Sequence, residues 1–309
     1  MWFSSAFALI AVALFHVLGV SAIPTGAITV GSGGKYSTLA AALKDTSRLG
    51  PSLSSFRNFR SYLHHASNVY YVYAGTYTGQ VAISRSNIAI YGETTNTASY
   101  TGNKVTFTAA VPASQAGSND ASGTVRVLAS GVKLYNLNIA NTYGKPVSQS
   151  QAIALSVQAG QFGCYGCKIT GTQDTLLANV GTQVYAKSYI SGYVDFIFGQ
   201  TASIWITKSV IETTGSGYVT ASGRSSNDAN YYVIDQTTIQ GSGTSYLGRP
   251  WRNYARVIVQ KRWVCPNSLE DSKLTRYFKK YYRKQYSKGW LVSLELVRPK
   301  NRPCNIRRI

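Results

Sequence analysis

Short apolar stretches alternate with small polar turn residues along most of the chain after residue 68. The stretches VYYVYAGTY, QVAI and NIAIYG contain many β-branched and aromatic residues, and glycine punctuates them. Runs of this length and composition are typical of β-strands, because helices need longer segments with apolar positions three and four residues apart. The pattern therefore predicts a chain built mainly from short strands.

Five of the strand-like stretches form a loose internal repeat. VKLYNLNI, CYGCKI, VYAKSYI, IWITKSVI and YVIDQTTI end in isoleucine at positions 139, 169, 190, 211 and 239, in steps of 30, 21, 21 and 28 residues. Strands that recur at such intervals suit stacked coils whose faces form parallel sheets. A β-sandwich would favour short hairpin links such as Asn-Gly, which the sequence lacks. We predict one all-β domain over residues 23–260, folded as a single-stranded right-handed parallel β-helix.

A short helix is predicted before the first strand of the coil. Leu39, Ala42 and Leu43 lie on one helical face, and Ser37 or Thr38 can cap the helix. An apolar face of this size is suited to covering the open end of the first coil.

The first 22 residues have the organisation of a secretory signal peptide. An apolar run from Ala6 to Val20 precedes the small residues Ser21 and Ala22. A membrane anchor is the alternative, but the run is shorter than the roughly 20 apolar residues that a spanning helix needs. We expect a secreted, extracellular protein with no membrane partner.

Two segments depart from the strand pattern. We interpret residues 48–68 as a surface loop or as an unexcised intron. Residues 261–309 contain 14 Lys/Arg and 3 Asp/Glu, so this tail supplies more than half of the formal charge of +20. We interpret the tail as the product of a differently spliced end rather than as a genuine basic appendage, and we expect it to add no strand to the coil.

The chain has four cysteines, Cys164, Cys167, Cys265 and Cys304. They would be free to oxidise outside the cell, but the sequence leaves their pairing open. Cys164 and Cys167 have C-x-x-C spacing without a nearby histidine or a second such pair, so we expect no metal and no other cofactor. If Cys167 points into the core, Cys164 points away or lies in a turn, and a bridge between the two would be strained.

Two of the eleven acidic residues, Asp174 and Asp195, stand among apolar and aromatic neighbours in segment 171–199. Burying an ionised carboxylate is costly unless it is paired, hydrogen-bonded or protonated. One of two such groups can act as a general acid and the other as a base or nucleophile. The alternative is a structural role for each, with Asp174 capping a turn and Asp195 pairing with an arginine. All three histidines lie before residue 66, which argues against a Ser-His-Asp hydrolase and a histidine-bound zinc.

Four motifs resemble the signature set of the pectin methylesterases. They are QAIALSV from Gln151, GTQDTL from Gly171, YISGYVDFIFG from Tyr189 and LGRPW from Leu247. They stand in the family's order at roughly its spacing, and the resemblance covers about residues 27–47 and 69–260. It implies a pectin lyase-like β-helix and an enzyme that hydrolyses methyl esters of polygalacturonate, releasing methanol and pectate.

The resemblance also implies a catalytic role for five residues. Asp195 would be the nucleophile, kept ionised by Arg249. Asp174 would be the acid that protonates the departing methanol and then activates water. Gln151 and Gln173 would donate hydrogen bonds to the oxyanion.

Three aromatic residues are candidates for substrate binding. Trp251 offers a flat apolar face to a sugar ring, and Phe198 and Tyr143 would extend this platform. The basic charge suits a polyanion such as partly de-esterified pectin. We expect a monomer that binds this polymer and no nucleic acid.

Two other functions remain open at this point. Polygalacturonases and pectate lyases also act on this polymer, but they use larger groups of carboxylates, with histidine or calcium, whereas the motif stretch offers only Asp174 and Asp195. A non-catalytic wall-binding product, prevented from folding stably by its altered carboxy-terminal part, is the second alternative.

Overall fold

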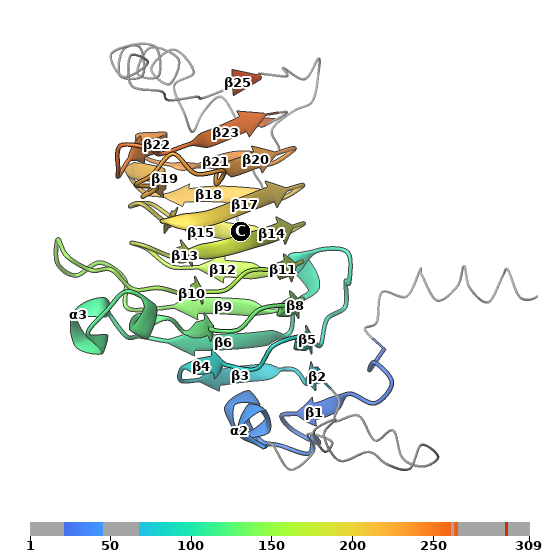
Figure 1. Cartoon of the computed structure of the whole chain (residues 1–309). Helices are drawn as coiled ribbons and strands as arrows, with labels where there is room; N and C mark the ends of the chain where they lie inside the picture. The colour runs from blue at the N-terminus through green and yellow to red at the C-terminus, as the bar shows by residue number, and fades with distance from the viewer. Residues whose placement is uncertain (1–21, 46–67, 261–262, 265–293, 296–309) are drawn as a thin grey trace, which may run out of the picture.

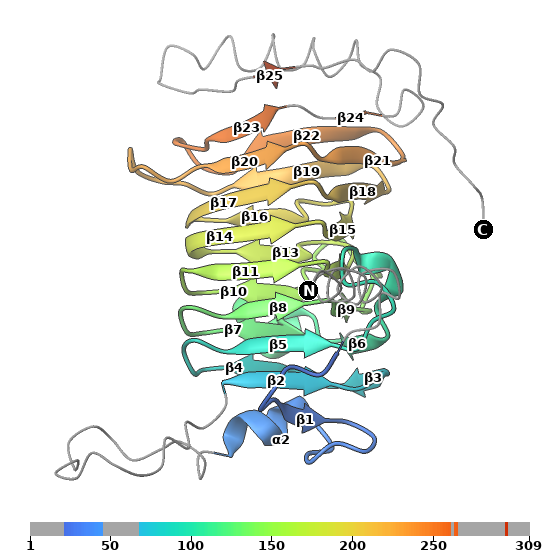
Figure 2. The same ribbon diagram turned by 90° about the vertical axis from the view of Figure 1, so that its right-hand side faces the viewer.

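The computed structural model describes residues 22–45, 68–260, 263–264 and 294–295. In this part of the chain the backbone winds into stacked coils, and successive strands of a coil belong to different parallel sheets (Figures 1 and 2). Each strand pairs with the equivalent strands of the coils below and above it. This arrangement confirms the predicted right-handed parallel β-helix.

Within the described residues the strands form sheets of ten, eight and seven strands. The ten-stranded sheet contains β1 (Ile28–Val30), β2 (Val69–Val72), β5 (Ala89–Gly92), β8 (Lys133–Tyr135), β11 (Phe162–Tyr165), β14 (Val180–Ala186), β17 (Thr201–Thr207), β20 (Tyr232–Asp235), β23 (Val257–Gln260) and β25 (Leu294–Glu295). The eight-stranded sheet contains β3 (Gly75–Thr78), β6 (Val105–Ala109), β9 (Asn138–Asn141), β12 (Lys168–Thr170), β15 (Tyr189–Gly192), β18 (Val210–Thr214), β21 (Thr238–Ser242) and β24 (Trp263–Val264). The seven-stranded sheet contains β4 (Val81–Ile83), β7 (Val125–Val127), β10 (Leu155–Val157), β13 (Leu176–Ala178), β16 (Ile197–Gly199), β19 (Gly217–Ser222) and β22 (Ser245–Pro250).

The repeated isoleucines form a continuous stack inside the coil. They are paired in register along the eight-stranded sheet and have no exposed surface; they are Ile139, Ile169, Ile190, Ile211 and Ile239. Each fully buried isoleucine is worth about 1.5–3 kcal/mol relative to an exposed one. The stack therefore stabilises the coils along the eight-stranded sheet.

The predicted amino-terminal helix is present as α2 (Leu39–Lys44). Thr38 caps it, because its Oγ1 accepts a hydrogen bond from the Ala41 N–H at 3.2 Å. Leu39, Ala42 and Leu43 are buried in the core, and the helix lies at the blue end of the stack in Figure 1. The other helical segments in the described part of the chain are η2 (Tyr100–Gly102), α3 (Ala113–Ala116) and η3 (Asp120–Ser122).

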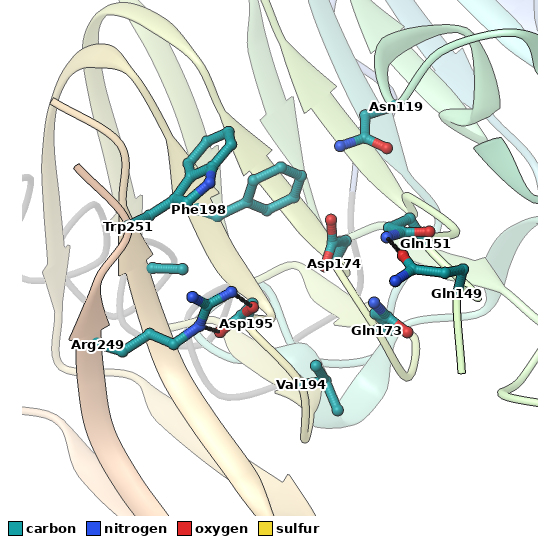
Figure 3. Close-up of a pocket in the computed structure, with 11 residues that line it drawn as sticks. Asn119, Gln149, Gln151, Gln173, Asp174, Val194, Asp195, Phe198, Arg249 and Trp251 are labelled. Atoms are coloured by element: carbon teal, nitrogen blue, oxygen red, sulfur yellow. Dashed lines mark hydrogen bonds and ion pairs between the residues drawn. The ribbon is translucent and has the colours of Figure 1, made fainter. Parts of the chain in front are cut away.

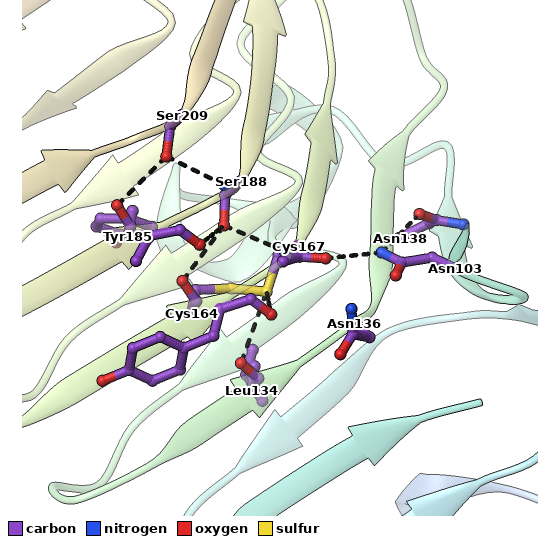
Figure 4. The surroundings of a disulfide bond; sticks show 12 residues. Asn103, Leu134, Asn136, Asn138, Cys164, Cys167, Tyr185, Ser188 and Ser209 are labelled. Carbon is purple, nitrogen blue, oxygen red and sulfur yellow. Dashed lines mark hydrogen bonds between the residues drawn. A yellow bond between two sulfur atoms is a disulfide. The ribbon is translucent and has the colours of Figure 1, made fainter. Parts of the chain in front are cut away.

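A disulfide joins Cys164 and Cys167, whose Cα atoms are 6.0 Å apart (Figure 4). Both residues are fully buried, so the expectation that the two side chains diverge is wrong. The reason is Gly166, whose φ of +61° lies in the left-handed region and interrupts the alternation of sides along a strand. Residues on either side of this corner therefore both face the core. One coil further on, Ser188 takes the place of Cys167 and accepts a hydrogen bond from its N–H at 3.1 Å.

The unequal repeat steps reflect two long loops at the edges of the seven-stranded sheet. The 30-residue step contains loop 142–150, which leads toward β10, and the 28-residue step contains loop 223–231, which leaves β19. The two 21-residue steps between them have shorter turns. The short coils thus lie between two coils with long loops.

The expectation that the tail adds no strand is wrong at two places. β24 pairs in parallel with β21, and β25 pairs in parallel with β23. The rest of the tail, the expected signal peptide up to residue 21 and the insert up to residue 67 lie outside the described residues. Among the helices that the structure describes, none is long and apolar enough to cross a bilayer.

Candidate functional site

A cavity of about 300 Å³ lies against the outer side of the seven-stranded sheet (Figure 3). Turns that lead into this sheet form one side, the sheet supplies the floor, and the turn after β22 forms the other side. The lining residues are Asn119, Gln149, Gln151, Gln173, Asp174, Val194, Asp195, Phe198, Ala221, Arg249 and Trp251. The cavity brings together all five of the predicted catalytic residues.

A row of outward-facing residues crosses the seven-stranded sheet, and three of them, Phe198, Ala221 and Arg249, line the cavity. Leu177, Phe198, Ala221 and Arg249 are paired in register on β13, β16, β19 and β22. The first three pack with Ile153 in a small apolar cluster separate from the main core. The small side chain of Ala221 leaves room for Arg249 to reach back across β19 toward the turn before β16.

Asp174 and Asp195 occupy equivalent corners of successive coils. Both have a left-handed backbone, with φ of +63° and +50°, which aspartate tolerates better than most residues. The corner interrupts the strand alternation, and both carboxylates line the cavity (Figure 3). The preceding residues, Gln173 and Val194, form a parallel β-bridge with each other, so the two corners are held in register.

Asp195 and Arg249 form a two-point ion pair. Arg249 Nε lies 2.8 Å from Asp195 Oδ1, and Arg249 Nη2 lies 2.5 Å from Asp195 Oδ2. The hydrogen bonds to Asp195 raise the pKa of Arg249 further above its ordinary value. A guanidinium fork of this kind fixes the orientation of a carboxylate as well as its charge. Asp195 is therefore a preoriented anion at the cavity wall.

Asp174 is in the opposite electrostatic situation. It is 7% exposed, and burial, followed by the negative charge of Asp195, raises its pKa to about 8. Arg249 and Lys145 act in the other direction, but they are outweighed. At neutral pH the raised pKa keeps the Asp174 carboxyl group mainly protonated, in the same cavity as the Asp195 side chain that Arg249 holds in a two-point ion pair.

We expect Asp174→Asn to stabilise the folded protein at neutral and alkaline pH. Between the ordinary pKa of 3.8 and the folded-state value of about 8, the folded state holds a proton that the unfolded state has lost. Stability therefore falls as pH rises through this window. Asparagine stays neutral and removes that dependence. Thermal unfolding should show a Tm advantage for the variant that grows up to about pH 8 and then levels off; an advantage that is the same at pH 4 and pH 8 would contradict the raised pKa.

The two glutamines differ in how firmly they are held. Gln173 Oε1 accepts hydrogen bonds from Lys145 Nζ at 2.6 Å and from the Ser150 N–H at 3.2 Å, which leaves its amide nitrogen facing the cavity (Figure 3). Gln151 Nε2 donates one hydrogen bond to Gln149 Oε1 at 2.6 Å and keeps a second N–H for another acceptor. Both side chains can therefore present an N–H donor to a negatively charged oxygen.

The predicted aromatic platform is only partly as expected. Trp251 is 39% exposed and lines the cavity. Phe198 also lines it, but only 3% of Phe198 is exposed, and its ring meets the Trp251 ring edge-on with centroids 6.3 Å apart. Tyr143 is partly buried in loop 142–150 and is not among the lining residues. Among the three predicted aromatic residues, Trp251 is therefore the exposed one that lines the cavity, and the Arg252 guanidinium lies over its ring, 5.5 Å from the centroid.

Several residues that shape the site carry no recognisable sequence signal. Asn119 and Gln149 line the cavity from loops of irregular sequence. Gly223 lies beneath Trp251, where any Cβ would collide with the indole ring. Arg224 ties loop 223–231 to the turn after Trp251, because its Nη1 donates a hydrogen bond to Tyr254 O at 2.7 Å. The spacing of residues in the sequence predicts none of these contacts, because each contact joins different coils or loops.

The arrangement is suited to nucleophilic substitution at a carbonyl carbon. It supplies an oriented carboxylate, a protonated carboxyl group and amide donors around one cavity. Among the described residues, no group of three or more His, Cys, Asp or Glu side chains is placed to hold a metal ion.

Comparisons with known proteins give one consistent family. The pectinesterase family model matches residues 54–268. The chain is 44% identical over 248 residues to a probable pectinesterase A of Neosartorya fischeri, covering 78% of this chain and 71% of that protein. It is 43% identical over 271 residues to a pectinesterase of Aspergillus aculeatus, covering 82% of this chain and 77% of that protein.

Solved structures agree with the sequence comparisons. A pectin methylesterase from Aspergillus niger superimposes with a TM-score of 0.69 at 40% identity, over 81% of this chain and 81% of that one. A pectin methylesterase from carrot superimposes with a TM-score of 0.64 at 25% identity, over 82% of this chain and 80% of that one.

Proposed function

The chain belongs to the pectinesterase family, and on this premise we propose that Asp195 and Asp174 are the nucleophile and the acid/base of its reaction. The enzyme is a carboxylic ester hydrolase that releases methanol from methyl-esterified polygalacturonate. The observation that carries the assignment is the placement of two carboxyl groups in one cavity, Asp195 in a two-point ion pair with Arg249 and Asp174 buried without a hydrogen-bonded cation among the described residues.

In the first half-reaction, an oxygen of ionised Asp195 attacks the carbonyl carbon of the methyl ester. The amide N–H groups of Gln151 and Gln173 donate to the oxyanion of the tetrahedral intermediate, where one such donor is typically worth about 3 kcal/mol. The intermediate collapses with cleavage of the bond to the methoxy oxygen, which takes the proton of Asp174 and leaves as methanol. The galacturonyl group is then joined to Asp195 as an anhydride.

In the second half-reaction, Asp174 is ionised and takes a proton from a water molecule that attacks the galacturonyl carbonyl carbon. Collapse of the second tetrahedral intermediate breaks the anhydride and releases Asp195 as a carboxylate. Asp174 is again protonated, and the product acid loses its proton to solvent. Arg249 holds Asp195 in the same orientation at the start and at the end of the cycle.

Substrate binding is proposed to centre on Trp251. Its partly exposed indole ring lines the cavity and is suited to packing against the apolar face of a galacturonate ring. Phe198 packs edge-on against the indole ring of Trp251. Contact between Tyr143 and the polymer stays a prediction, and it would involve a part of the polymer that lies outside the cavity.

The enzyme is further proposed to be exported and to act as a monomer, without nucleic-acid or membrane partners. Export is supported by the apolar run and small residues within the first 22 positions. The formal charge of +20 supports attraction to a polyanionic polymer.

The mechanism predicts that turnover falls on the alkaline side of the pKa of Asp174. That pKa is about 8, and the protonated form is the one that delivers a proton to methanol, so kcat should decline as pH rises above this value. Methanol release from saturating esterified pectin, corrected for alkaline hydrolysis without enzyme, measures this limb. Constant polymer length in the same samples separates esterase action from chain cleavage, and a flat profile up to pH 10 would contradict the role of Asp174.

A further inference from the structure

Lys145, in loop 142–150, places its ammonium group among three oxygen acceptors. Its Nζ donates to Gln173 Oε1 at 2.6 Å, to Val147 O at 3.2 Å and to Ser148 O. An ammonium group has three protons, so each one has a partner. The side chain is partly buried, and the contacts join the loop to the residue that precedes Asp174.

Ser150 completes this arrangement from the same loop. Its N–H donates to Gln173 Oε1 at 3.2 Å, and its Oγ donates to Val147 O at 2.7 Å. The Gln173 oxygen therefore has a donor at each of its two lone pairs. The reverse amide orientation would set the NH₂ group against an ammonium and an N–H, both of which are donors. Only one orientation of the Gln173 side chain satisfies the contacts, and in it the amide nitrogen faces the cavity.

We propose that Lys145 is a positioning residue for catalysis, which holds the Gln173 amide so that its N–H groups meet the oxyanion formed from the ester. The inference rests on the proposed role of Gln173 as an oxyanion donor. A preoriented donor loses no orientational freedom when the oxyanion forms. The positive charge on the amide oxygen also polarises the group, which strengthens donation from its nitrogen.

A direct contact between Lys145 and a substrate carboxylate is the simpler role for a lysine near a polyanion site. The contacts argue against it, because all three ammonium protons already have protein acceptors. Lys145 is also not among the residues that line the cavity. Loss of Lys145 should therefore act on kcat through Gln173 and have little effect on KM.

A double-mutant cycle tests the proposal. Gln173→Ala should reduce kcat by about a hundredfold or more, which is the usual cost of losing one oxyanion donor. Lys145→Met, which keeps the length of the side chain without its charge, should reduce kcat by at least about tenfold with KM within about threefold of wild type. In the Gln173→Ala background, Lys145→Met should change kcat by less than about twofold.

Two further variants separate positioning from damage to the loop or the fold. Lys145→Arg keeps a charged donor and should retain more activity than Lys145→Met. The two variants should have the same Tm. Lys133→Met removes an exposed lysine on β8, away from the cavity, and should leave kcat and KM unchanged.

The alkaline limb of kcat gives an independent reading of the ammonium position. Burial and then the charge of Asp195 raise the pKa of Asp174, whereas Arg249 and Lys145 lower it. Lys145→Met should therefore move the alkaline limb to higher pH, and Gln173→Ala should leave it in place. An unmoved limb in Lys145→Met would show that the ammonium does not lie against the site, and would overturn the proposal.

The kinetic outcomes distinguish the positioning role of Lys145 from the proposed oxyanion role of Gln173. If Gln173→Ala lowers kcat and Lys145→Met does not, the positioning role is wrong and the proposed mechanism stands. If the two effects multiply in the double variant, Lys145 acts independently of Gln173 and the positioning role is also wrong. If Gln173→Ala leaves kcat unchanged, the proposed oxyanion role fails, and the inference about Lys145 fails with it.

Discussion

Asp195→Asn is expected to lower methanol release by at least about four orders of magnitude, the scale on which enzymes that act through a covalent intermediate lose rate when the nucleophile is removed. Asparagine has nearly the shape of aspartate but no anionic oxygen to attack the ester. It also replaces one of the two acceptors that Arg249 contacts at 2.8 and 2.5 Å with an NH₂ group. The rate should be measured as methanol released per enzyme molecule from highly esterified pectin.

The control for this variant is substrate binding. The cavity keeps Trp251 and both glutamines, so affinity for esterified pectin should stay close to that of the wild type. Turnover within about tenfold of wild type would remove Asp195 from the nucleophile role. Asp195→Ala, which cannot revert by deamidation, should be equally inactive and guards against a trace of regenerated aspartate.

Arg249→Lys is expected to reduce kcat by at least about a hundredfold, because loss of orientation at a reacting group can cost that much. Lysine keeps the positive charge but has no planar fork, so it cannot hold both oxygens of Asp195 at once. It would also have to reach across β19 above Ala221, as the arginine does. The effect should fall on kcat far more than on KM, since Arg249 is proposed to orient the nucleophile.

Arg126→Lys provides a matched comparison on the same sheet. Arg126 lies on β7, and its Nη2 pairs with Asp120 Oδ2 at 2.5 Å, away from the two cavity aspartates. This variant should keep kcat within about threefold of wild type. Near-normal turnover in Arg249→Lys would reduce Arg249 to a structural counter-charge, and an equal loss in both variants would point to the sheet rather than to the site.

The fold was predictable because the sequence repeats the physical unit of the structure. The isoleucines that mark each repeat are the residues that stack in the eight-stranded sheet, so the spacing reports the coil directly. The side-chain direction at corners was not predictable in the same way. Cys164 and Cys167 both face inward because Gly166 adopts a left-handed conformation, and strand alternation cannot anticipate that change.

The site, like the fold, was predictable only in part. Asp174, Asp195 and Arg249 stand in motifs, and the structure brings them together. Other contacts of the site join residues from different loops, and these contacts are not contained in any motif. Lys145 reaches Gln173 across 28 positions, and Trp251 lies over Gly223. Local patterns carry no information about such pairings, because they depend on which side of the sheet each loop crosses.

The reach of Arg249 back to Asp195 has a consequence for the order in which the enzyme becomes active during synthesis. The two residues are 54 positions apart, which corresponds to about 3–11 s of translation at about 5–20 residues per second. A nascent chain that ends before β22 contains both aspartates but lacks the cation that orients one of them. With the roles proposed for Asp195 and Arg249, we expect hydrolytic competence to be acquired late, when the coil that contains β22 docks on the coils already formed.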